Sequence, residues 1–230
     1  MTRNCHATSK RTNKLLTRIT IALLCLIISS AASAYRKPDG EYFNILPLFW
    51  SKVYPNGGKT IYCGRKFGSD KGWDINIEHL FPMGWTLKKF HCRDRRHCRR
   101  TSPEFNRIEA DMHNLYPSRK DINHARGSHA FAMIKGERRH YGQCDIEINQ
   151  RRRQVEPRPD SRGNIARAMF YMHSTYGLKI FRKQGKLLKQ WHREDPPDAE
   201  ERRRNNVIEK IQGTRNRFID RPGQAYALRF

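Results

Sequence analysis

The stretch Ile77-Glu78-His79-Leu80-Phe81-Pro82 places a carboxylate directly beside a histidine. A second stretch, Asp111-Met112-His113-Asn114-Leu115-Tyr116-Pro117-Ser118, follows further along the chain and is itself followed by Asn123. A carboxylate and an amide oxygen can together hold a divalent cation, and a histidine can accept a proton near neutral pH. These residue types in this order therefore indicate a hydrolytic site that is assisted by a metal ion.

Residues 73–78 alternate between apolar and polar side chains, which predicts a β-strand that ends at the Glu-His pair. Neighbouring residues on a strand face opposite ways. Glu78 and His79 can therefore serve one site only if the chain twists, bulges or ends there.

A helix is predicted to begin at Ser102, because a capping side chain precedes a proline and an acidic residue. We expect this helix to run to Pro117. Glu109 and His113, four residues apart, would then share one stripe of its surface.

Further helices are predicted from the spacing of apolar residues. One starts at Asn164 or Ser161 and ends at Gly177, one lies around residues 187–191, and a last short one covers residues 207–211 and ends at Gly213. The charged segment 194–204 is expected to be an exposed loop. The predicted fold class is α+β, a mixed and helix-rich single domain.

Residues 1–34 have the composition of a cleavable signal peptide. Five basic residues and no acidic one precede the apolar segment 19–28, which is short for a bilayer span. Ala32-Ser33-Ala34 matches the small-residue cleavage pattern, so the mature chain is expected to start at Tyr35. An uncleaved membrane anchor is the alternative. Residues 35–230 would then form one domain.

The charge of the chain predicts a polyanionic partner. Loss of the five basic signal-peptide residues lowers the formal charge from +24 to +19, an excess that repels itself in a compact domain. Nucleic acid is the commonest such partner, and anionic glycans or membrane surfaces are alternatives. Because no strongly amphipathic basic helix stands out, a lipid surface ranks last.

Four cysteines remain in the mature chain: Cys63, Cys92, Cys98 and Cys144. An even number in an exported protein predicts disulfides, and four cysteines allow three pairings. We expect Cys92–Cys98 to close a small basic loop and Cys63–Cys144 to join distant segments. A zinc site that uses the neighbouring histidines is the alternative, although the spacing of Cys92 and Cys98 fits it poorly.

These ordered motifs make the chain resemble the bacterial endonuclease I family of secreted nucleases. The resemblance rests on Glu78-His79-Leu80-Phe81-Pro82, residues 108–118, Asn123 and Arg126-Gly127, and it covers roughly residues 62–218. It implies a ββα-metal (His-Me finger) motif within the α+β fold. It also implies an endonuclease that cleaves DNA, and often RNA, with little sequence preference.

The resemblance also implies roles for particular residues. His79 would be the general base, and Glu78 and Asn123 would hold one Mg²⁺, for which Mn²⁺ or Ca²⁺ could substitute. Cleavage would leave 5′-phosphate ends. Arg95 would clamp a phosphate, with Arg96 as the alternative for this role.

Other residues are expected to support this site or to bind the substrate. By the same resemblance, Glu109 would orient Arg95 or a metal-bound water, and His113 and Asn114 would support the site from behind. Basic side chains are expected to contact the phosphate backbone. They are Arg96, Arg99, Arg100, Arg119, Lys120, Arg126 and residues 151–153.

The sequence therefore predicts a monomeric nuclease that is periplasmic or secreted. It is expected to bind DNA, and RNA in some members of the family. Once the signal peptide is removed, no binding to a membrane is expected. The alternative is a non-catalytic exported basic protein that binds DNA or another polyanion. The positive charge and the basic loop fit this alternative as well as they fit a nuclease.

Overall fold

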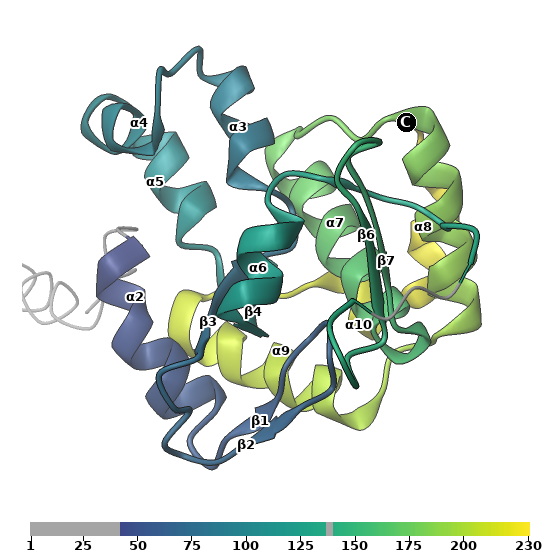
Figure 1. Ribbon diagram of the computed structural model, residues 1–230. Helices are drawn as coiled ribbons and strands as arrows, with labels where there is room; N and C mark the ends of the chain where they lie inside the picture. Colours follow the sequence, from purple (N-terminus) through teal and green to yellow (C-terminus); the bar gives the residue numbers. More distant parts are fainter. Residues whose placement is uncertain (1–41, 137–139) are drawn as a thin grey trace, which may run out of the picture. The chain divides into compact units, whose positions relative to one another are not determined.

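The computed structural model describes residues 42–136 and 140–230 (Figure 1). The predicted signal peptide and the predicted mature start at Tyr35 lie outside the described residues. The helices are α2 (Tyr42–Leu48), the π-helical turn Phe49–Val53, α3 (Met83–Lys89), α4 (Arg95–Thr101), α5 (Pro103–Glu109), α6 (Lys120–Arg126), α7 (Arg162–Tyr176), α8 (Arg182–Glu194), α9 (Ala199–Gln212) and α10 (Arg217–Asp220). Short 3-10 turns cover Met112–Asn114, Pro159–Ser161 and Pro222–Ala227.

The strands are short and lie in small sheets, so the fold is α+β as predicted. They are β1 (Gly58–Lys59), β2 (Lys66–Phe67), β3 (Ile75–His79), β4 (Leu115–Arg119), β5 (Ala130–Phe131), β6 (Ile146–Asn149) and β7 (Gln154–Pro157). β1 pairs with β2, β3 pairs with β4, and β5, β7 and β6 form a sheet in that order.

The antiparallel pair β3–β4 carries the Glu-His dipeptide. Ile75 lies opposite Arg119, and His79 lies opposite Leu115. The strand ends at His79, which satisfies the condition set by the sequence for Glu78 and His79 to serve one site. α6 follows β4 directly and packs against both strands (Figure 1).

The prediction that one helix runs from Ser102 to Pro117 is half wrong. Ser102 does cap α5, since its hydroxyl accepts the Phe105 N–H. The helix, however, ends at Glu109, and the Asp111 carboxylate then accepts the His113 N–H to start a 3-10 turn. Pro117 lies inside β4, where its missing N–H is tolerated in a two-stranded pair and its carbonyl accepts the Ile61 N–H at 2.8 Å.

The prediction of an exposed loop over residues 194–204 is also wrong for its second half. Asp198 begins α9 with a capping box, in which its carboxylate accepts the Glu201 N–H and the Glu201 side chain accepts the Asp198 N–H. Glu201 is buried and accepts a 2.7 Å hydrogen bond from the equally buried Arg167. The predicted helix ends at Gly177 and Gly213 are confirmed, because both glycines have the left-handed backbone.

Two apolar clusters hold β3 and β4 in place. One joins α7 and α8 to the β5-β7-β6 sheet and includes Tyr116 of β4 and Ile122. The other joins α2 to α9 and includes Ile77 and Leu115. Because the strand pair contributes side chains to both clusters, the end of β3 is fixed from two sides.

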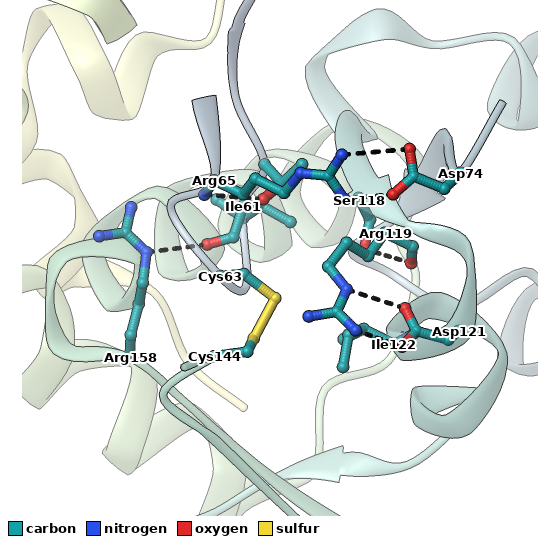
Figure 2. Close-up of a disulfide and its surroundings, with 11 residues drawn as sticks. Ile61, Cys63, Arg65, Asp74, Ser118, Arg119, Asp121, Ile122, Cys144 and Arg158 are labelled. Carbon is teal, nitrogen blue, oxygen red and sulfur yellow. Dashed lines mark hydrogen bonds and ion pairs between the residues drawn. A yellow bond between two sulfur atoms is a disulfide. The ribbon is translucent and has the colours of Figure 1, made fainter. Parts of the chain in front are cut away.

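Both predicted disulfides are present, Cys63–Cys144 and Cys92–Cys98. The first ties the segment before β3 to the segment before β6, beside the Arg158 guanidinium that donates to the Ile61 carbonyl (Figure 2). The second occupies both thiols of the basic loop and so leaves none for a zinc ion. None of the helices in residues 42–136 and 140–230 is long and apolar enough to cross a bilayer.

Candidate active site

A cavity of about 760 Å³ opens beside the end of β3. The predicted base, the two predicted metal ligands and the predicted phosphate clamp line it together: His79, Glu78, Asn123 and Arg95. Two predicted DNA contacts, Lys120 and Arg126, also line it. These residues come from β3, α4 and α6, elements that are brought together by the clusters just described. The cavity is therefore built by segments that lie far apart in the sequence.

The His79 ring is held as a neutral imidazole. Its Nε2 lies 2.9 Å from the Glu109 carbonyl oxygen, which can only accept a hydrogen, so this nitrogen carries the proton. Nδ1 then keeps its lone pair. Burial, and next the positive charge of Arg95, lower the pKa of His79 to about 3. The ring is thus unprotonated at neutral pH, with the lone pair of Nδ1 as its proton-accepting position.

The Glu78 carboxylate is buried but not isolated. Its Oε1 accepts a 2.7 Å hydrogen bond from the Tyr62 hydroxyl and lies 2.9 Å from Nη1 of Arg126. Burial raises the pKa of Glu78, and the Arg126 charge and the Tyr62 hydrogen bond oppose this rise. One face of the carboxylate is therefore held by protein groups, and Glu78 also lines the cavity.

The prediction that Arg126 contacts the DNA backbone is wrong. Its side chain is 1% exposed, and its guanidinium donates to the carbonyls of His79 and Leu80 at 3.1 and 2.7 Å. Together with the ion pair to Glu78, these bonds fasten the end of β3 to the last turn of α6. Arg126 is an internal support of the candidate site.

Asn123 is oriented by its amide nitrogen. Nδ2 donates to Oδ1 of Asn76 at 2.9 Å and to the Ile77 carbonyl at 3.0 Å. Oδ1 of the same Asn123 amide is then the atom that another partner can use. A carboxylate and an amide oxygen that line one cavity suit a hard cation such as Mg²⁺, which keeps several of its own waters.

Glu109 is a buried carboxylate that binds two arginines. Its side chain is 0% exposed, Arg95 Nε donates to Oε1 at 2.6 Å, and Arg99 Nε donates to Oε2 at 2.6 Å. Burial acts to raise the pKa of Glu109, but the arginines outweigh it and hold this pKa below its usual value. Arg95 lines the cavity with 40% of its side chain exposed, so it is fixed at one end and accessible at the other.

The sequence pattern of the Endonuclease I family matches residues 44–223, which include every residue of this cavity except Tyr42. The chain belongs to this family. It is 34% identical over 225 residues to an extracellular deoxyribonuclease of Aeromonas hydrophila, covering 87% of this chain and 97% of the relative. A periplasmic deoxyribonuclease of the same organism is 32% identical, with 87% and 93% coverage. An extracellular ribonuclease of Bacillus subtilis is 33% identical over 49% of this chain and 44% of its own length.

Two further family-motif residues, Asn114 and His113, support different parts of the structure. The Asn114 side chain accepts the Phe81 N–H at 2.6 Å and donates to the Phe81 carbonyl at 3.1 Å, so it clamps the chain just after His79. His113 points elsewhere: its Nε2 donates to the Thr214 carbonyl at 3.0 Å. The expectation that Glu109 and His113 share a helix stripe is therefore wrong, because α5 ends between them.

Sequence reasoning missed two tyrosines at the site. The Tyr42 ring lies 5.2 Å from the His79 ring and 5.6 Å from the Arg95 guanidinium carbon, measured from its centroid. Tyr62 binds Glu78 as described. Tyr62 lies at the start of the segment, roughly residues 62–218, that resembles the endonuclease I family, but nothing in the local sequence marks Tyr42.

The remaining predicted DNA contacts differ in their exposure. Arg96 and Arg100 are exposed on α4, whereas Arg119 is half-buried and pairs with Asp121 at 2.5 Å. Arg99 is partly committed to Glu109. Lys120 and residues 151–153 are exposed as well, and Lys120 lines the cavity. The exposed basic side chains that a phosphate backbone can reach therefore lie on α4, at the start of α6 and in the segment 151–153.

Proposed function

We propose that this protein is a metal-dependent nuclease that hydrolyses phosphodiester bonds of DNA with little sequence preference. The observation that carries this proposal is the meeting of Glu78, His79, Arg95 and Asn123 in one cavity. The deoxyribonuclease activity named for its relatives over most of their length supports the same conclusion. The ribonuclease relative makes RNA a second candidate substrate.

In this proposal β3, β4 and α6 form a ββα-metal (His-Me finger) motif. The antiparallel pair is followed directly by a helix, β3 carries Glu78 and His79, and α6 carries Asn123. Each strand and the helix contributes to a packed cluster, so the three side chains are held on rigid elements. Rigid placement of reacting groups is a general source of catalytic rate.

The residues would divide the work of hydrolysis. His79 Nδ1 would take the proton of an attacking water, because Nε2 is committed to the Glu109 carbonyl. Glu78 and Asn123 would hold Mg²⁺, whose charge stabilises the phosphoryl and leaving oxygens when it is bound. Arg95 would bind a phosphate oxygen and is oriented by Glu109. The products would carry 5′-phosphate ends.

We also propose that the protein acts outside the cytoplasm. The Aeromonas relatives are extracellular and periplasmic, and the two disulfides are stable only where thiols are oxidised. Residues 1–34 would serve as the signal for this export.

Plasmid cleavage by the purified protein tests the proposal. Wild-type protein with Mg²⁺ is expected to nick and degrade plasmid DNA, EDTA to stop it, and His79→Ala to slow it by about 10²–10⁴-fold, the usual contribution of a general base. His140→Ala is the matched control, since His140 is exposed and does not line this cavity.

Wild-type cleavage rates in the His79→Ala protein would contradict the assignment of the base. Tight DNA binding without strand cleavage under any divalent cation would instead support the polyanion-binding alternative.

A further inference from the structure

Trp73 is an exposed aromatic residue that the fold does not use. Its side chain is 84% exposed, more than that of any other large apolar residue in the described parts of the chain. A tryptophan is normally buried for most of its surface, because its large ring contributes strongly to packing. An open ring face of this size next to an active site therefore suggests a ligand.

The backbone around Trp73 is anchored. The Asp74 carbonyl accepts the Lys120 N–H at 2.8 Å, and the Asp74 carboxylate is paired with the Arg65 guanidinium (Figure 2). On the other side, the Gly72 N–H donates to the Asp70 carboxylate at 3.0 Å. Trp73 thus stands on a loop that is tied to the start of β3 and of α6, and its exposure is a property of an ordered site.

Lys120 connects this ring to the cavity. Its Nζ lies 5.9 Å from the centroid of the Trp73 ring, and Lys120 also lines the cavity that holds His79 and Asn123. Lys120 and Asn123 are the first and fourth residues of α6, about 4.5 Å apart along the helix axis. Lys120 is therefore close both to the Trp73 ring and to Asn123, so one bound strand can contact all three.

We propose that Trp73 stacks on an unpaired base of the strand held in the cavity, with Lys120 binding the intervening phosphate; this inference rests on the proposed function. Aromatic rings in basic grooves bind single strands in this way, because every base has a flat face. In a duplex the bases are already stacked on one another and their faces are covered. Trp73 would therefore favour single-stranded or locally opened substrate over intact duplex.

Binding of a fluorescently labelled oligo-dT and of a duplex of equal length, measured by anisotropy in EDTA, tests this role without cleavage. Trp73→Ala is expected to weaken single-strand binding about fivefold or more, the low end for loss of one stacked base. Duplex binding is expected to change less than about twofold, and Trp73→Phe to retain most of the single-strand affinity. Tyr226→Ala, which removes another exposed ring away from the cavity, is the matched control.

Equal single-strand affinity in wild type and Trp73→Ala, or equal losses for single strand and duplex, would overturn the proposal. An unchanged thermal midpoint of Trp73→Ala shows that the comparison concerns folded protein. This binding experiment does not depend on catalysis. If Trp73→Ala has no effect on binding, the nuclease proposal is still tested by His79→Ala. If the protein never cleaves DNA, Trp73→Ala can still weaken its binding to a single strand.

Discussion

At the scale of single residues, the candidate site depends on buried groups that hold the reacting ones. Glu109 does so twice, since its backbone carbonyl binds Nε2 of His79 and its carboxylate binds Arg95 and Arg99. Arg126 does the same for Glu78. Neighbours of this kind commonly matter almost as much as the groups that touch substrate.

Replacing Glu109 by Gln should therefore reduce activity. The variant keeps the backbone carbonyl but loses the charge that orients Arg95, so kcat/KM should fall by about 10–100-fold. Unfolding free energy should fall by about 1–3 kcal/mol, less than for a fully buried pair because both arginines can turn to solvent. Glu104→Gln, on the same helix and exposed, is the control for plasmid cleavage and thermal melting; equal effects in the two variants would contradict this role.

At the scale of elements, the turn between α5 and β4 decides where Asn114 meets the chain just after His79. Asp111 caps the turn and accepts hydrogen bonds from the Tyr171 and Tyr176 hydroxyls. His113 packs on the Tyr171 ring at 4.5 Å between centroids. The turn is thereby attached to α7, which explains why the helix predicted to reach Pro117 stops early.

His113 makes this turn sensitive to acid. Burial lowers the pKa of His113 to about 4, against an unfolded value of 6.5. Between these values the unfolded chain binds a proton that the folded chain does not, so stability falls as pH drops from 6.5 towards 4 and the loss levels off below that. The loss from this residue should amount to about 2–4 kcal/mol.

His113→Gln keeps a donor for the Thr214 carbonyl without a titrating group. Urea unfolding of wild type and variant between pH 4 and 7 should show a shallower pH dependence in the variant. Parallel curves would contradict the assignment to His113.

At the scale of the whole molecule, covalent and packing links join distant segments around the strand pair. The Cys63–Cys144 disulfide spans 81 residues and ties the segment before β3 to the sheet, whereas Cys92–Cys98 spans only 6. Loss of a link that closes the longer loop should release more entropy in the unfolded chain.

Replacing both cysteines of each pair by serine measures this difference. Cys63→Ser with Cys144→Ser should cost about 4 kcal/mol of unfolding free energy, and Cys92→Ser with Cys98→Ser about 2 kcal/mol. Chemical denaturation of the two double variants beside wild type gives both values. A larger loss from the short loop would show that local strain or packing, not loop length, governs these links.

The sequence alone determined those features of the structure that depend mainly on residues close together in the chain. The strand that ends at His79, the helix cap at Ser102, the helix ends at Gly177 and Gly213 and both disulfides were predicted. Each depends on residues adjacent in the chain or, for the disulfides, on the small number of available cysteines. The α+β class follows from the same local patterns.

Only the tertiary structure decided which side chains face the cavity and which support it from within. Arg126 has the same charge as the surface arginines, but its guanidinium bonds residues 46 and 47 positions away and is buried. Tyr42 and Tyr62 reach the site through packing that no local pattern encodes. The end of α5 depends likewise on a partner on α7, whereas the start of α9 is a local capping box between Asp198 and Glu201. Burial and long-range pairing change what a residue does without changing its type, because they set its solvent exposure and its partners.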